Sequence, residues 1–258
     1  MVAPKQPSLF LPHGAPDLVI SGHAAARFLT DYSAQLSKPE GIVIVSAHWQ
    51  CPGLSLTGPG PLATIHDFGG FPAELYEIHY PAFASENLVG MVKHSLRAAC
   101  LEVSVHPSRG LDHGAWVPLS LLYPGADIPV VQLSLGSSQD GAGHIAVGRA
   151  LAPLRDRNVM IIGSGGSVHN LRAVAPEGSP VPAWATAFDS WLETVLVDND
   201  LERLARFQSN APHADIAHPS TEHFLPLLVS AGAGGESVEK IHGGYSYGSI
   251  GMSAWAFR

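Results

Sequence analysis

The chain has few charged side chains and very few cysteines. Only 14% of its 258 residues are charged and 46% are hydrophobic, which excludes the composition of a disordered protein. The formal net charge is -8 and no basic cluster stands out, so nucleic-acid binding has little electrostatic support. Two cysteines, Cys51 and Cys100, cannot build a disulfide framework, which favours a reducing compartment.

Long apolar runs are also missing. No run approaches the ~20 residues that cross a bilayer, and Met1 to Gln6 lack the charged and then apolar pattern of a signal peptide. We therefore expect a soluble, cytoplasmic protein with neither a membrane nor a nucleic acid as partner. The oligomeric state stays open, and a homo-oligomer is one alternative.

Short apolar runs alternate with amphipathic segments along the chain. The runs lack a period of two, as strands do when both faces are covered, and the amphipathic segments repeat apolar residues every three or four positions. This alternation predicts one α/β domain over residues 1–258, with a central, mainly parallel sheet flanked by helices. The predicted strands are Pro7–Leu11, Gly41–Ser46, Ile128–Leu135 and Val159–Ile162, and the predicted helices are His23–Leu36, Glu86–Ala99, His144–Arg155, Trp184–Val197 and one from near Thr221.

Three segments fall outside this alternation. Cys51 to Phe83 has little periodicity and many Gly, Pro and aromatic residues, and a long irregular segment in a compact domain is often functional. Ala231 to Gly235 reads as a loop. Tyr245 to Phe257 alternates apolar and small residues, which indicates a closing strand or hairpin.

Histidine is unusually abundant. The chain has 14 histidines, as many as lysine and arginine combined, and histidine is the commonest metal ligand. His13, His48 and His169 each stand shortly after a predicted strand. Ligands bind outside the carboxyl ends of strands in open α/β sheets, so these three side chains can converge. A single histidine is ordinarily a surface or hydrogen-bonded core residue, and only their placement argues otherwise.

Two further histidines are candidates. His223 lies in the first turn of the helix predicted from near Thr221, and its neighbour Glu222 is a rival ligand. Adjacent helical residues point about 100° apart, so both are not expected to reach one metal. His113 occurs in the run Asp112-His113-Gly114.

Five short runs carry a resemblance when they are taken in order. Together they resemble the class III extradiol dioxygenases, in particular the DOPA-dioxygenase branch, over nearly the whole chain. The resemblance implies a single α/β domain and a non-haem Fe(II) that opens catechol rings with O2, with zinc in some relatives. The runs are Ser46-Ala47-His48-Trp49, Ile65-His66-Asp67-Phe68-Gly69-Gly70-Phe71-Pro72, Asp112-His113-Gly114, Val168-His169-Asn170-Leu171 and Glu222-His223-Phe224-Leu225-Pro226-Leu227-Leu228.

The resemblance also implies a role for each histidine. It makes His13, His48 and His223 the metal ligands. It makes His169 the acid–base group beside the metal, or a further ligand in zinc-bearing relatives, and His113 a hydrogen-bonding partner of substrate or oxygen. One departure is Ala15, where the family usually has serine after His-Gly, and the loss of that hydroxyl puts substrate choice in doubt.

The residues themselves suit this chemistry. Three facial ligands on a ferrous ion leave about three positions open, enough for a catechol and O2. The catechol loses protons as it binds, and His169 is the candidate base. Trp49, Phe68 and Phe71, and also Tyr80, could wall an aromatic ring, although core packing explains each equally well.

Two rival functions remain open on the sequence. One is a zinc-dependent hydrolase on the same scaffold, with His169 or Glu222 as its base. The other is a non-catalytic protein that binds a metal or a partner, because a fold does not fix a function. Oxygen dependence of turnover separates the first from a dioxygenase, and binding of a catechol separates the second.

Overall fold

The computed structural model describes residues 5–138 and 140–258. The expectation for Met1 to Gln6 rests mainly on residues 1–4, which lie outside the described residues. Among the helices that the structure describes, none is both long and apolar enough to cross a membrane.

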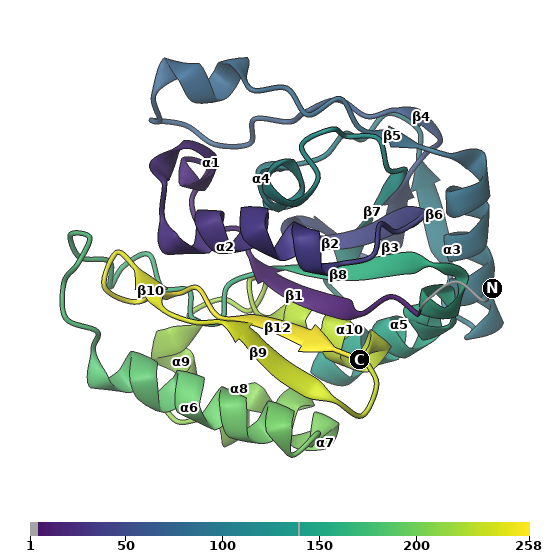
Figure 1. The fold of residues 1–258 in the computed structure, drawn as a ribbon. Coiled ribbons are helices and arrows are strands. Elements are labelled where there is room, and N and C mark those ends of the chain that lie inside the picture. The colour runs from purple at the N-terminus through teal and green to yellow at the C-terminus, as the bar shows by residue number, and fades with distance from the viewer. Residues whose placement is uncertain (1–4, 139) are drawn as a thin grey trace.

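A mixed eight-stranded sheet forms the centre of the molecule, in the order β6-β3-β7-β2-β8-β1-β12-β9 (Figure 1). The middle strands β7, β2, β8 and β1 are mutually parallel, while β3 and β12 join this group antiparallel. The predicted mainly parallel sheet is therefore confirmed for its middle. The strands of this sheet are β1 (Ser8–Pro12), β2 (Gly41–Cys51), β3 (Leu54–Thr57), β6 (Val103–His106), β7 (Val130–Gly136), β8 (Val159–Gly165), β9 (Val238–His242) and β12 (Ala254–Phe257).

Helices cover both faces of the sheet. In Figure 1, α2 and α4 lie above it and α5 and α10 below it, and α10 packs directly on β8 and β1. Two small antiparallel sheets pair β4 (Gly60–Pro61) with β5 (Phe83–Ala84) and, as a hairpin, β10 (Tyr245–Ser246) with β11 (Ile250–Gly251). The α-helices are α1 (Leu18–Ser21), α2 (Ala24–Tyr32), α3 (Glu86–Ala98), α4 (His113–Leu122), α5 (Gly141–Leu151), α6 (Ala183–Val197), α7 (Leu201–Ala205), α8 (Phe207–Asn210), α9 (Ala214–Ala217) and α10 (Leu225–Ala233), and 3-10 turns lie at Ser33–Gln35, Ala73–Glu77 and Ala152–Arg157.

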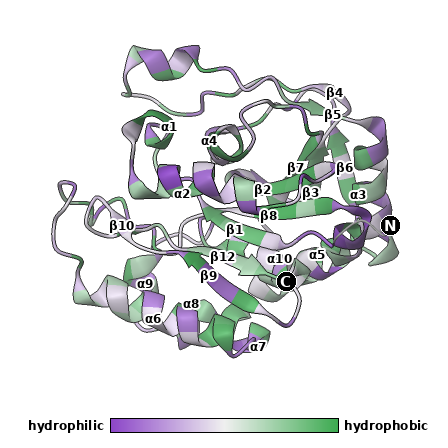
Figure 2. Ribbon diagram, in the orientation of Figure 1, coloured by the Kyte–Doolittle hydropathy of each residue, from purple (hydrophilic) through white to green (hydrophobic). Residues whose placement is uncertain are grey.

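Burial of the middle strands explains their sequence. Every residue of β1, β7 and β8 is buried, so apolar side chains are favoured at consecutive positions. Figure 2 shows these strands as the hydrophobic centre of the fold, with hydrophilic residues on the outer helices. One contiguous apolar core extends across both faces of the sheet.

Several sequence-based boundaries need correction. The last helix begins at Leu225, not near Thr221, because Pro226 is pre-organised for a first helical turn. The stretch predicted as a loop from Ala231 is helical as far as Ala233. The irregular segment after Cys51 contains β3, which pairs within the main sheet.

The close approach of α10 to the sheet requires a glycine in β8. A Cβ at Gly165 would lie 2.1 Å from the carbonyl oxygen of His223, far inside contact distance. The backbone N–H of the next residue, Gly166, donates to that same carbonyl at 3.0 Å. The turn before α10 is thereby fixed against the end of β8.

A buried arginine joins the two ends of the chain. Arg155 is 1% exposed and donates to the carbonyl oxygens of Gln6, Ala233 and Phe257 at 2.7, 2.7 and 3.1 Å.

We expect Arg155→Ala to lower the free energy of unfolding by about 3 kcal/mol or more, because three buried acceptors lose their donor. Urea denaturation measures this loss. The exposed Arg157 is the control, and equal stability of Arg155→Ala and Arg157→Ala would contradict the prediction.

Candidate metal centre and active site

The carboxyl ends of three neighbouring strands meet at one edge of the sheet. Pro12 at the end of β1 pairs with Gly165 at the end of β8, and Ser46 of β2 pairs with Ser164. His13 follows β1 directly and His169 follows β8 by four residues. His48 lies within β2, which runs on to Cys51 past a register shift between Val45 and Gln50.

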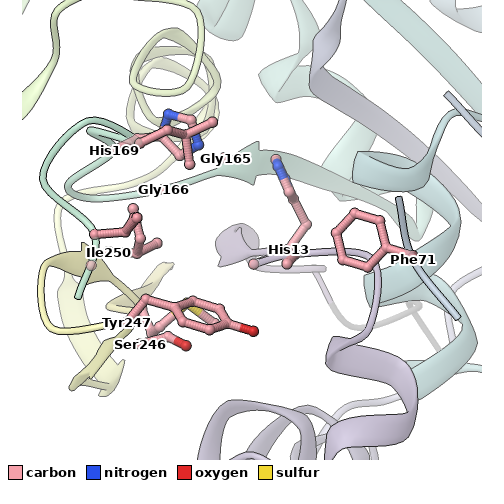
Figure 3. Close-up of a pocket in the computed structure, with 14 residues that line it drawn as sticks. His13, Phe71, Gly165, Gly166, His169, Ser246, Tyr247 and Ile250 are labelled. Carbon is pink, nitrogen blue, oxygen red and sulfur yellow. The ribbon is translucent and has the colours of Figure 1, made fainter. Parts of the chain in front are cut away.

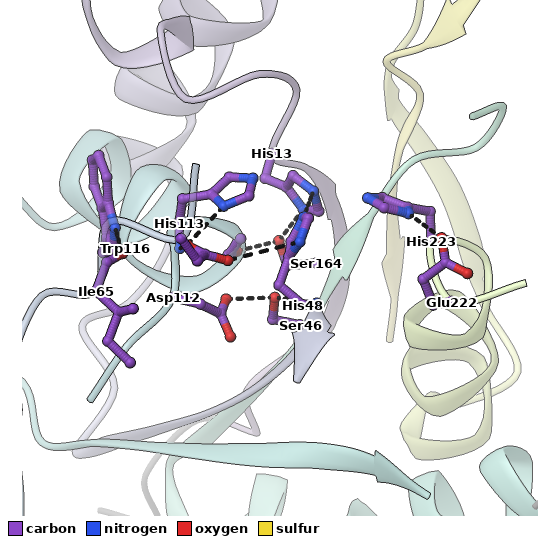
Figure 4. A network of polar contacts seen from close by, with 12 residues as sticks. His13, Ser46, His48, Ile65, Asp112, His113, Trp116, Ser164, Glu222 and His223 are labelled. Carbon is purple, nitrogen blue, oxygen red and sulfur yellow. Dashed lines mark hydrogen bonds and ion pairs between the residues drawn. The ribbon is translucent and has the colours of Figure 1, made fainter. Parts of the chain in front are cut away.

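Five histidines gather at this edge. The rings of His13, His48 and His223 form a nearly equilateral triangle, with centroids 5.0, 5.0 and 5.4 Å apart. His113 lies 3.9 Å from His48, and His169 stacks on His223 at 3.5 Å. Figure 4 shows His223 reaching from the turn before α10 toward the other rings. The structure thus brings together every histidine that the sequence singled out.

His13 and His48 turn unprotonated nitrogens toward each other. Ser164 donates its hydroxyl to the carbonyl of Gly114, so its oxygen accepts the Nδ1–H of His13 at 2.9 Å. The carboxylate of Asp67 lies 3.8 Å from His48 Nδ1 and favours a proton on that atom. Both Nε2 atoms then carry lone pairs, yet they lie only 3.1 Å apart.

That separation fits a shared cation. Two nitrogens bound at ~2.1 Å to one ion, about 90–110° apart, would be about 3.0–3.4 Å from each other. Two facing lone pairs repel, and a cation between them removes the repulsion. The donor set is all nitrogen, which suits Fe²⁺ and Zn²⁺ and does not suit Mg²⁺ or Ca²⁺.

His223 is oriented by its neighbour in sequence. Its Nδ1–H donates to Glu222 Oε1 at 3.0 Å, which leaves Nε2 free to bind a metal. This hydrogen bond has the largest effect on the carboxyl group of Glu222 and holds its pKa at about 2. Both residues lie in a turn and not in a helix, so the expectation that adjacent helical side chains point about 100° apart does not apply to them. Glu222 instead supports His223, although it stays within 4.8 Å of the donor atoms of His169 and His223.

His113 pairs with an aspartate from the long segment after β3. Asp67 Oδ1 accepts from both the backbone N–H and Nδ1–H of His113, each at 2.9 Å. Burial opposes ionisation of Asp67, but the bonds from His113 outweigh it and hold its pKa at about 2. From the sequence alone, Asp67 could be interpreted only as part of a hydrogen-bonded loop or of the mouth of the site, because its place in the same short run as His66 was the only signal.

The donor atoms of His113, His13 and His48 also lie within 4.8 Å of one another, so these three are a second possible ligand set.

His169 is held by the loop that follows β8. Its backbone N–H donates to the carbonyl of Ala217 at 2.9 Å, and the Nε2–H of His218 donates to the carbonyl of Ser167 at 3.0 Å. His218 itself lies outside the cluster, buried against Phe188 and Phe224. It therefore supports the loop of His169 from behind and does not face the metal centre.

A buried polar network lies beneath the histidines. Ser46 donates to Asp112 Oδ1 at 2.7 Å, and Gln132 and Arg109 donate to the other oxygen of that carboxylate. At Gly114 a Cβ would lie 2.3 Å from Ser46 Oγ and 3.0 Å from a ring carbon of His48. Only glycine therefore lets the start of α4 approach the ligands. No local pattern in the sequence indicates this network, because its members are scattered along the chain.

Burial keeps the central imidazoles neutral. It lowers the pKa of His48 and of His169 to about 3, and neighbouring histidines add to the effect. Burial, followed by repulsion from His48, also holds the pKa of His13 well below its usual value. At neutral pH these three rings are unprotonated, which metal ligation and proton acceptance both require.

A cavity of about 270 Å³ opens beside this cluster (Figure 3). His13, Ala15, Phe71 and His169 line it, together with residues of the β10–β11 hairpin. Phe68 packs against Phe71 and against His113, with centroids 5.4 and 5.8 Å apart.

Two of the candidate aromatic walls lie elsewhere. Trp49 is 5% exposed and packs under Arg109, because successive residues of a strand point to opposite faces and His48 points into the site. The proposed substrate contact for Trp49 is therefore corrected. Tyr80 is buried in the core and donates to the carbonyl of Tyr123. His66 also faces away, with Nε2 donating to the carbonyl of Ile78.

The sequence matches a known protein family, and that family fits the geometry of the site. Residues 16–258 match the model described as the catalytic LigB subunit of aromatic ring-opening dioxygenase. The chain belongs to this family. It is 41% identical over 256 residues to the 4,5-DOPA dioxygenase extradiol of Beta vulgaris, which covers 97% of this chain and 96% of that protein. It is 39% identical to the protein of the same name from Escherichia coli (strain K12), covering 98% and 94%.

A solved structure agrees with this assignment. A crystal structure of an uncharacterized Escherichia coli K12 protein superposes with a TM-score of 0.84 at 34% identity, covering 98% of this chain and 100% of that one. The resemblance to class III extradiol dioxygenases is therefore confirmed, and so is the α/β fold. This dioxygenase is an oxidoreductase, and its histidine cluster and adjoining cavity lie at the carboxyl ends of the parallel strands.

Proposed function

We propose that this enzyme is a non-haem Fe(II) dioxygenase that opens a catechol ring by extradiol cleavage. The observation that carries the proposal is the triangle of His13, His48 and His223 beside an apolar cavity. These three residues would hold the metal, as the resemblance to the extradiol dioxygenases implies, and His113 would act as a hydrogen-bonding partner held by Asp67. When bound there, the ferrous ion supplies electron transfer between catechol and O2.

The identity of the native metal is a separate part of this proposal. Neutral nitrogen ligands bind Zn²⁺ more tightly than Fe²⁺, so availability and handling decide which ion a preparation contains. Membership of a dioxygenase family supports iron, since chemistry with O2 needs a redox-active ion and Zn²⁺ is not redox-active.

Two histidines outside the ligand triangle handle protons. His169 lines the cavity with an unprotonated imidazole, and a catechol made more acidic at the site could pass a proton to it and take that proton back after the ring opens. His113 keeps its Nδ1–H on Asp67, which leaves its Nε2 as a hydrogen-bond acceptor.

The walls of the cavity hold the aromatic ring. Phe71 lines the cavity beside His13, on the side opposite Ile250 in Figure 3, and Phe68 packs against Phe71. An apolar wall excludes water from the reacting ring and fixes its plane. We therefore keep Phe71 and Phe68 as substrate-positioning residues.

The compartment follows from the cysteines. Cys51 and Cys100 are both free thiols, and Cys100 is exposed. Exposed thiols persist in reducing surroundings, so we propose that the enzyme works in the cytoplasm.

The reaction itself is the decisive test. We expect protein reconstituted anaerobically with Fe²⁺ to consume one O2 per catechol and to form a yellow semialdehyde that retains both oxygen atoms. Extradiol cleavage breaks the carbon–carbon bond beside the diol, so a conjugated enol and aldehyde remain. An oxygen electrode beside a visible spectrum measures both quantities, with an anaerobic sample as the control.

The same experiment separates the rivals. Turnover that continues without O2 would replace the dioxygenase with a zinc hydrolase. A protein with full iron occupancy that binds catechols but consumes no O2 would contradict the proposal as well. A colourless diacid would mean intradiol cleavage.

A further inference from the structure

The cavity beside the histidines has an apolar rim that no part of the proposed reaction uses. Leu171 is 67% exposed, Val174 is 47% exposed and Tyr247 is 38% exposed, and all three line the cavity. Leu171 and Val174 follow His169 along the chain, while Tyr247 comes from the β10–β11 hairpin. Large apolar side chains gathered at a cavity mouth indicate a ligand that covers them.

The hairpin side of this rim is held in place. The backbone of Tyr247 lies in the left-handed region at φ 49°, which is unfavourable for a bulky residue. Glu177 accepts from its backbone N–H at 2.7 Å and from Ser246 Oγ at 3.0 Å, and Asp17 accepts from its hydroxyl at 3.3 Å. These bonds fix the ring of Tyr247 at the mouth, which fits a binding surface better than a loose loop.

Formal charge is missing from the cavity. Among its lining residues in the described chain there is no Lys, Arg, Asp or Glu. The carboxylates of Asp17 and Glu177 line an adjoining cavity behind Tyr247. Their oxygens already accept bonds from Ser246 and Tyr247, and Glu177 is half exposed to water. Glu222 lies beside His169 and already accepts from His223. A charged group in the main cavity would lose water without gaining a partner.

We propose that the substrate is a catechol with an uncharged, apolar substituent, which lies against Leu171, Val174 and Tyr247 while the diol faces the histidines. This inference rests on the proposed ring cleavage and adds the chemistry of the substituent. It differs from the amino-acid side chain of DOPA, the compound in the names of the Beta vulgaris and Escherichia coli relatives. The apolar Ala15 in the same lining agrees with it.

Four catechols with a similar chain length test the proposal. They are 4-propylcatechol, dopamine, 3-(3,4-dihydroxyphenyl)propionate and DOPA, which share the ring and differ in charge. We expect kcat/KM of the Fe²⁺-loaded enzyme to be about 10-fold or more higher for 4-propylcatechol than for each charged compound, mainly through KM. Anaerobic titration of the same enzyme should give the same order of Kd without any turnover.

A matched pair of variants assigns the effect to the rim. Leu171→Arg should lower kcat/KM for 4-propylcatechol by about 10-fold and raise it for the propionate, because the new cation pairs with its carboxylate. The control is Val197→Arg. Val197 is 63% exposed, nearly as much as Leu171, but lies at the end of α6, and its variant should keep the parent's preference.

The outcomes separate this inference from the proposed function. Comparable Kd values for all four catechols would overturn the apolar substituent and leave ring cleavage standing. A preference for dopamine would overturn it in favour of the cavity with Asp17 and Glu177. Absence of O2 uptake with every compound would overturn the proposed reaction, while the anaerobic Kd order would still decide the substituent.

Discussion

Without the imidazole of His13 or His48, the protein should not retain its metal. We expect His13→Ala and His48→Ala to leave dialysis with less than about one tenth of the parent's iron. Each variant removes one of two nitrogens that lie 3.1 Å apart and are aligned by Ser164 and Asp67. Loss of one ligand from three leaves too few donors for a divalent ion at this site. Elemental analysis of dialysed protein measures the occupancy.

A neutral histidine change provides the control. His94 lies on α3 and is exposed, so His94→Ala should hold as much iron as the parent. Circular dichroism would verify that each variant is folded. Full occupancy in both His13→Ala and His48→Ala would refute the ligand assignment. Retention after His113→Ala, together with loss after His223→Ala, would favour the His13, His48 and His223 set over the set with His113.

The second large effect concerns proton transfer. We expect His169→Asn to keep most of its iron while kcat falls by ~10²-fold or more, the usual contribution of a positioned acid or base. Asparagine has a comparable size and can still pack on His223, but it cannot accept a proton at neutral pH. Oxygen uptake on a catechol, beside elemental analysis of the same sample, measures both properties.

The iron content decides between the two roles of His169. Loss of iron together with activity would make His169 a fourth ligand, since its donor atom lies within 4.8 Å of those of Glu222 and His223. Unchanged activity would remove His169 from the mechanism. His94→Asn, at an exposed position away from the cluster, should match the parent in both measurements.

The sequence was most informative where one physical rule dominates. The continuous apolar runs of β1, β7 and β8 predicted strands buried on both faces, because short runs rich in Val, Ile and Leu that alternate with amphipathic helices are typical of a parallel sheet. The position of His13 and His169 after such strands was enough to predict that they converge. The rings of both lie in the cluster.

Other features depend on tertiary contacts that leave no local pattern. The helix α4 is buried on nearly every face and contains Pro118, so it lacks the periodicity of an amphipathic helix. β2 continues past Ser46 through a register shift, and this extension turns Trp49 away from the site. The rim residues Leu171 and Tyr247 are brought together only by the folded chain.

The spacing of the ligands along the chain has a thermodynamic consequence. His13, His48 and His223 are separated by most of the sequence, so the unfolded chain offers no comparable site. An ion that binds only the folded protein stabilises it by RT ln(1 + [M]/Kd), which is about 2.7 kcal/mol when the free metal exceeds its dissociation constant 100-fold. Supply of the metal would thus govern how long the folded enzyme survives, in addition to how fast it works, and starvation for that metal would expose the chain to proteolysis.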